Sequence, residues 1–213
     1  MGEHVSRCGG TPCVCRFISE TEAEVATYRK ILFIGLGILA VELIGAFASG
    51  SLALASDAGH VFVDLTVVGT AFAIAARELR RIEPNPRIRF FGACLQAVLL
   101  FAVAASILFE VKRRIDFPHE VEPWPLFAAA ILGLVGNAYQ YQISGKAKNR
   151  MHRGINVHIA SDFACSSIAV GSGPLIVLSG WTEIDIIASC AIGIAIVVFG
   201  LPAILRADGH RHA

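Results

Sequence analysis

Long runs of apolar residues most constrain what this 213-residue chain can fold into. Each is about 18 to 25 residues long, which as a helix is enough to cross a bilayer core of about 30 Å. Six such runs follow one another, at 31–48, 52–76, 90–111, 124–143, 154–178 and 184–205. A mean hydropathy of +0.64 and 16% charged residues exclude an ordinary soluble domain. We therefore expect an all-α membrane protein, a six-transmembrane-helix bundle.

The basic residues between these runs predict the orientation of the bundle. Fifteen of the 18 Lys and Arg residues lie before the first run, after the second, after the fourth or after the sixth. The other three are Lys112, Arg113 and Arg114, after the third run. The positive-inside rule then places both termini in the cytoplasm. We expect a flexible cysteine-containing cytoplasmic tail at 1–28, a membrane domain at 29–205 and a short cytoplasmic tail at 206–213, in a bacterial inner membrane.

Two of the apolar runs contain a histidine followed four residues later by an aspartate. His60 and Asp64 lie in the second run, and His158 and Asp162 lie in the fifth. Side chains at i and i+4 share a helix face, so each pair presents a nitrogen and a carboxylate in the same direction. The two helices run antiparallel, and the rise per residue places Asp64 and Asp162 near the same depth. We expect the two pairs to form one site.

Two imidazoles and two carboxylates suit a tetrahedral metal, Zn²⁺ first, with Cd²⁺ and Co²⁺ as further candidates. Mg²⁺ and Ca²⁺ prefer six or more oxygen ligands and fit poorly. Imidazole must be neutral to bind metal, so metal binding and protonation compete. The pattern predicts a metal/proton antiporter, not an enzyme, with Zn²⁺ as transported substrate and no organic cofactor. Its partners are the lipid bilayer, divalent cations and protons, and a net charge of +1 gives no indication of nucleic-acid binding.

Three alternatives remain beside this interpretation. The polar residues can be helix-packing groups that never bind metal. An intramembrane metalloenzyme would need a general base beside the metal, as in His-Glu-x-x-His, and that motif is absent from the sequence. A membrane metal sensor, or a binding protein without transport, would use the same four ligands.

Further polar residues are weaker candidates for the site. Asp57, one turn before His60, is an auxiliary metal ligand or proton relay, or else a residue placed near a helix N-terminus. Cys8, Cys13 and Cys15 offer thiolates for metal capture in the N-terminal tail. The remaining residues are expected to serve packing, support or helix capping: Cys165, Ser166, Glu42, Gln96, Asn137 and Asp185.

The segment from Ser51 to His60 (SLALASDAGH), continuing to Asp64, resembles the second-helix signature of the cation diffusion facilitator family of zinc transporters. The segment from His158 to Asp162 is similar to that family's fifth-helix motif. Further matches are Glu42 before Gly45, Phe91-Gly92, Glu110 with Arg113-Arg114, Gly180-Trp181, and the run from Asp185 to Ser189. The resemblance covers about residues 29 to 205.

The resemblance implies a six-helix homodimer that exports zinc from the cytoplasm by alternating access, driven by inward proton movement. It also implies that His60, Asp64, His158 and Asp162 form the transport site. Family members usually continue into a cytoplasmic metal-binding domain, whereas this sequence stops at Ala213. We therefore expect a dimer held by the membrane helices or their loops.

Overall fold

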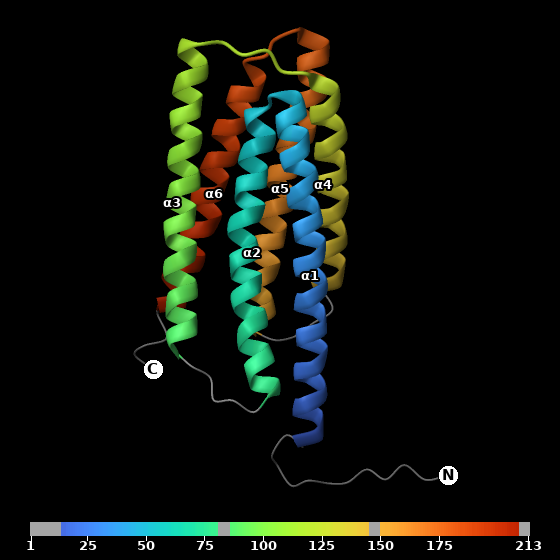
Figure 1. Cartoon of the computed structure of the whole chain (residues 1–213), viewed down its shortest axis with the longest axis vertical. Coiled ribbons are helices and arrows are strands. Elements are labelled where there is room, and N and C mark those ends of the chain that lie inside the picture. The colour runs from blue at the N-terminus through green and yellow to red at the C-terminus, as the bar shows by residue number, and fades with distance from the viewer. Residues whose placement is uncertain (1–13, 81–85, 145–149, 209–213) are drawn as a thin grey trace, which may run out of the picture.

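Six helices make up the described part of the chain, which in this computed structural model comprises residues 14–80, 86–144 and 150–208 (Figure 1). For 14–21, 78, 86–89, 93, 150–158, 160 and 199–208 the description covers the backbone path only. The helices are α1 (Val14–Ser49), α2 (Leu52–Leu79), α3 (Pro86–Asp116), α4 (Pro123–Ser144), α5 (Arg150–Ser179) and α6 (Ile184–Asp208). The predicted all-α architecture is confirmed.

Four segments of the described residues are long and apolar enough to cross a membrane: Glu22–Ser49, Leu52–Arg77, Phe90–Asp116 and Ser161–Ser179. In α6 the described side chains form a shorter apolar segment, Ile184–Val198. The apolar run of α4 is interrupted by Asn137, Gln140 and Gln142, of which the first two are buried inside the bundle. In a bilayer a helix satisfies its own backbone hydrogen bonds, which explains why these apolar runs are helical. The chain is an integral membrane protein.

The path of the chain makes consecutive helices antiparallel (Figure 1). The α1–α2, α3–α4 and α5–α6 connections lie at one end of the bundle, here called the hairpin end, and α1 begins and α6 ends at the other. In the α1–α2 connection Gly50 has φ 66°, a conformation that costs glycine little. Because α2 starts at the hairpin end and α5 ends there, these two helices run in opposite directions.

Helix α2 is central in the packing. It contacts α1, α3, α5 and α6, whereas α4 packs between α1 and α5, and α3 lies at the edge beside α2 and α6 (Figure 1). The fully buried Leu54, Leu126 and Ile192 belong to the main apolar cluster. Many large apolar side chains are nevertheless exposed on the outer faces, among them Phe47 and Phe109. Such an apolar outer surface suits contact with lipid.

Helix α1 is longer than the first apolar run. It begins at Val14, whereas the sequence predicted a flexible tail at 1–28. Tyr28 and Ile31 are buried against α2 residues such as Val68 and Ala71. This packing, which hydropathy along one segment does not reveal, stabilises the helix just before the apolar run.

Asp185, expected to cap its own helix, caps α2 instead. Its Oδ1 accepts hydrogen bonds from Ser51 Oγ at 2.5 Å and Ala53 N at 3.2 Å, and its Oδ2 accepts one from Leu52 N at 2.6 Å. Arg114 Nη1 lies 3.2 Å from Oδ2. The carboxylate therefore satisfies the free N–H groups at the start of α2 and joins that helix to α3 and α6.

We predict that Asp185→Ala lowers the free energy of unfolding by about 3 kcal/mol, because Arg114 and two backbone N–H groups lose a buried charged partner. Equilibrium denaturation of the purified protein in detergent micelles measures this change. Glu183→Ala is the control, since Glu183 is exposed two residues earlier, and we expect a change within about 0.5 kcal/mol. Equal stabilities of the Asp185 variant and the wild type would contradict the capping role.

Candidate metal centre

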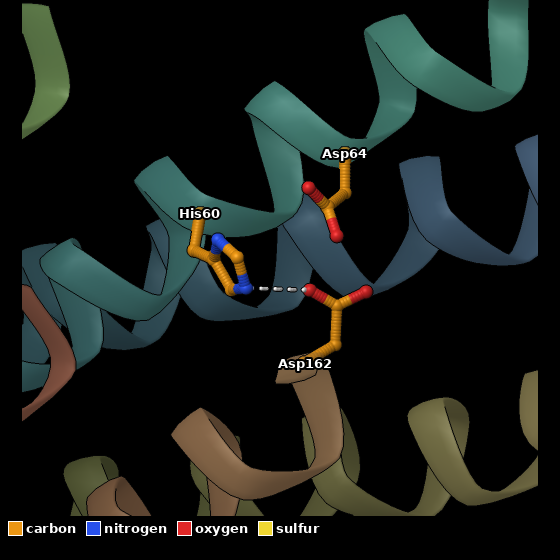
Figure 2. A group of neighbouring side chains, drawn as sticks. All are labelled: His60, Asp64 and Asp162. Atoms are coloured by element: carbon orange, nitrogen blue, oxygen red, sulfur yellow. Dashed lines mark ion pairs between the residues drawn. The ribbon is translucent and has the colours of Figure 1, made fainter. Parts of the chain in front are cut away.

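His60 and Asp64 lie one helical turn apart on the face of α2 that is turned toward α5 (Figure 2). Both are buried, with exposed fractions of 2% and 5%. The uninterrupted helix from Leu52 to Leu79 gives them the shared direction that the four-residue spacing predicts. Two polar side chains of α2 therefore project into the bundle and away from lipid.

Asp162 faces them from α5 (Figure 2). Its Oδ1 lies 3.3 Å from His60 Nε2, and the hydroxyl of the preceding Ser161 lies 3.0 Å from the same nitrogen. One ligand atom each of His60, Asp64 and Asp162 can be chosen so that all three lie within 4.8 Å of one another. Among the described residues these three form the group whose spacing suits a metal ion.

His158, the fourth expected ligand, precedes Asp162 by one turn in the continuous backbone of α5. Its side chain lies outside the described residues, and so does that of Cys15. Cys8 and Cys13 belong to residues 1–13, which are also outside them. Metal binding by His158 and by the three cysteines therefore stays a prediction.

The charges of the group favour a bound cation. Asp64 and Asp162 place two carboxyl groups close together in the membrane, where an isolated carboxylate costs at least about 2.5 kcal/mol. Two like charges at this distance are unfavourable together unless a proton or a metal ion lies between them. One imidazole nitrogen and two carboxylate oxygens are donors that Zn²⁺ accepts at about 2.0 to 2.2 Å. The arrangement can thus exchange a divalent cation for protons.

Asp57 is buried but belongs to a different set of contacts. Its Oδ2 accepts a hydrogen bond from Ser166 Oγ at 2.8 Å, and Ser166 Oγ accepts one from Asn137 Nδ2 at 2.9 Å. The structure thus places Asp57 outside the group of three potential ligands. Ser166, expected to serve packing, is instead part of a hydrogen-bond chain, and Cys165 beside it is buried with a free thiol.

The sequence did not point to Ser161 or Gln140. Ser161 contacts His60, and its position directly before Asp162 was the only sequence signal for it. Gln140 Nε2 donates to the carbonyl oxygen of Ile31 at 3.0 Å, joining α4 to α1. Its position three residues after Asn137 indicates a shared helix face but not the partner.

Comparison with known families identifies the chain. A family model described as the cation efflux transmembrane domain matches residues 30–207. The chain belongs to the cation efflux family. This finding confirms the resemblance that the helix signatures indicated and covers all six helices except the first part of α1 and the last residue of α6.

Curated relatives support the same membership. The chain is 32% identical over 169 residues to the zinc transporter ZitB of Yersinia pestis, covering 75% of this chain and 54% of the relative. It is 30% identical over 185 residues to the cadmium, cobalt and zinc/H(+)-K(+) antiporter of Bacillus subtilis, covering 81% and 60%. Metal cation efflux system protein CzcD of Cupriavidus metallidurans is 32% identical over 164 residues, with 73% and 52% covered. The chain thus spans somewhat more than half the length of these relatives.

Proposed function

We propose that this protein exports divalent metal cations, Zn²⁺ first, in exchange for protons. The observation that carries the proposal is the convergence of His60, Asp64 and Asp162 from two antiparallel helices inside a membrane bundle. His158, one turn before Asp162, supplies the fourth ligand of a tetrahedral site. The relatives' names, which include zinc, cadmium and cobalt transport, support this class of substrate.

Proton coupling follows from the ligands. A neutral imidazole binds metal and a protonated one does not, and imidazole changes its charge within the physiological pH range. A metal ion entering between His60, Asp64 and Asp162 displaces protons from them, and protons arriving from the other side displace the metal. Exchange of one for the other is antiport.

Transport also requires the helices to move. The three described ligands are no more than 5% exposed, so a metal ion reaches them only when neighbouring helices separate. Alternate opening to the two faces gives alternating access to one fixed site. The site lies where α2 and α5 pack together, and relative movement of these helices changes access and ligand geometry at once.

The orientation and assembly belong to the same proposal. Arg29 and Arg77 lie on the half of the bundle away from the hairpin end, whereas Arg113 and Arg114 lie at that end. The positive-inside rule places the hairpin end outside and both termini in the cytoplasm of a bacterial inner membrane. Export then runs toward the hairpin end. The chain forms a homodimer through its membrane helices.

We predict that the purified protein binds Co²⁺ with the strong visible absorption of a tetrahedral site, because cobalt accepts the ligands that zinc does. His60→Ala removes the nitrogen ligand and should weaken Co²⁺ binding by at least about 100-fold. That loss exceeds the one expected when only a hydrogen-bond partner of a metal ligand is removed. Titration of the absorption with Co²⁺ measures the affinity. His119→Ala, an exposed histidine in the α3–α4 connection, should bind as the wild type does. Equal affinities of the His60 variant and the wild type would remove His60 from the metal centre.

Transport itself is tested in proteoliposomes that are acidic inside. We predict zinc uptake that a protonophore abolishes, and its loss in Asp162→Asn, which keeps the side-chain volume but removes the charge that binds metal. Asp116→Asn is the matched control, because Asp116 is exposed at the end of α3. A folded Asp162 variant with undiminished uptake would refute the site. Wild-type protein that binds zinc but moves none would instead support a metal sensor. Uptake of Cd²⁺ and Co²⁺, measured in the same assay, ranks these metals against zinc as substrates.

A further inference from the structure

A second buried polar cluster lies beside the metal centre, toward the hairpin end. It consists of Glu42 on α1, Asp57 on α2, Asn137 on α4 and Ser166 on α5, and each of these residues is 0% exposed. Asp57 precedes His60 by three residues, and Ser166 follows Asp162 by four. The cluster therefore lies about one helical turn from the candidate metal ligands. The metal centre does not account for these groups.

The hydrogen bonds of the cluster are directed toward one carboxylate. Asn137 Nδ2 donates to Ser166 Oγ at 2.9 Å, so the single hydroxyl hydrogen of Ser166 is left for Asp57 Oδ2, at 2.8 Å. One donor, the Ser166 hydroxyl, thus faces one oxygen of Asp57. This chain of two hydrogen bonds connects α4, α5 and α2 and fixes the position of the Asp57 carboxyl group.

The carboxyl group of Glu42 has no such donor. Its two oxygens and Oδ1 of Asp57 receive no hydrogen bond from the described residues. Glu42 lies close enough to Asp57 for the two carboxyl groups to hydrogen-bond once one of them carries a proton. On the other side it packs against Gly133 of α4, where a Cβ atom would collide with Oε1. The carboxyl group is therefore held against Asp57.

A proton satisfies this arrangement with the least change. Two adjacent carboxylates without counter-charge in a membrane are costly, and a single shared proton removes one charge and supplies the missing hydrogen bond. A transition metal would find no nitrogen or sulfur ligand in the cluster. The hydroxyl hydrogen of Ser166 already faces Asp57 and would repel a cation.

We infer that Glu42 and Asp57 form a carboxyl pair that holds one transported proton at a site separate from the metal. The inference rests on the proposed proton-coupled exchange and extends it. In each cycle the pair takes up one proton when the bundle is open toward the hairpin end and releases it on the other side. Only one carboxyl O–H bond forms and breaks in each cycle, and the charge of the proton offsets part of the charge that the metal carries in the opposite direction.

Other ionisable groups surround the pair, and the test must separate them from it. On α2 these are His60 and Asp64, and on α5 they are Asp162 and the thiol of Cys165. Asn137, the residue of the cluster that lies on α4, is polar but does not titrate. The charged groups of α3 and α6, Glu110, Arg113, Arg114 and Asp185, pair with one another near the hairpin end. Changing Glu42 alone leaves all of them in place.

The decisive variant is Glu42→Gln, because glutamine resembles a glutamic acid that never releases its proton. In vesicles with the membrane potential clamped, a pH dye and a zinc dye together report protons moved per zinc ion. We expect the variant to move one proton fewer per zinc ion than the wild type, with Co²⁺ affinity in detergent changed less than twofold. Glu22→Gln, at an exposed glutamate of α1, should keep the wild-type ratio. An unchanged ratio in the Glu42 variant would overturn the inference.

Infrared spectroscopy tests the pair without any transport. The metal-free wild-type protein should show the C=O band of a protonated carboxyl group, and Glu42→Gln and Asp57→Asn should each abolish it. A wild type that lacks the band at neutral pH would overturn the inference. Loss of the band on adding K⁺ at constant pH would also overturn it, because that result would indicate a cation site. Protein that shows the band but transports no zinc would refute the proposed function and leave the carboxyl pair in place.

Discussion

The structure depends on one constraint: inside a bilayer, a polar side chain must find its partner within the protein. Helix α2 carries several of the groups that need partners, and they occupy three levels along it. At the first level Asp185 binds the N-terminus of α2. At the second, one and a half turns further on, Asp57 contacts Ser166 and Glu42. At the third, His60 and Asp64 face Asp162. Each level attaches α2 to a different set of neighbouring helices, which explains its central position in the bundle.

Small residues make these contacts possible. A Cβ atom at Gly45 would collide with Ala129, and one at Gly133 would collide with Glu42, so α1 approaches α4 closely along this face. Ala53 and Ala58 of α2 and Ala169 of α5 are fully buried. Close approach of helix backbones allows short side chains such as Ser166 and Asp162 to reach across the bundle. The packing and the polar contacts therefore depend on each other.

The two inner levels differ in their chemistry, and the proposed exchange of ions depends on this difference. The group of His60, Asp64 and Asp162 combines nitrogen and oxygen ligands, which suits a metal or protons in turn. The pair of Glu42 and Asp57 offers oxygen alone, and the hydroxyl of Ser166, to which Asn137 donates, is already directed at Asp57. In the proposed cycle the metal site and the proton site are occupied in opposite halves, the metal on the way out and the proton on the way in. Competition at one site and charge compensation at the other would both couple metal movement to protons.

The sequence by itself determined the helices, their antiparallel order and the common level of Asp64 and Asp162. These follow from apolar length, basic connections and the rise per residue, which are properties of single segments. Only the tertiary structure decided that Asp185 caps α2, that Ser161 contacts His60 and that Asp57 bonds Ser166. These partners are 134, 101 and 109 residues apart, and they meet because of how each helix is rotated and packed. Hydropathy along the chain carries no information about rotation once several faces of a helix are polar or small. It likewise did not reveal that α1 begins before its apolar run, where Tyr28 packs against α2.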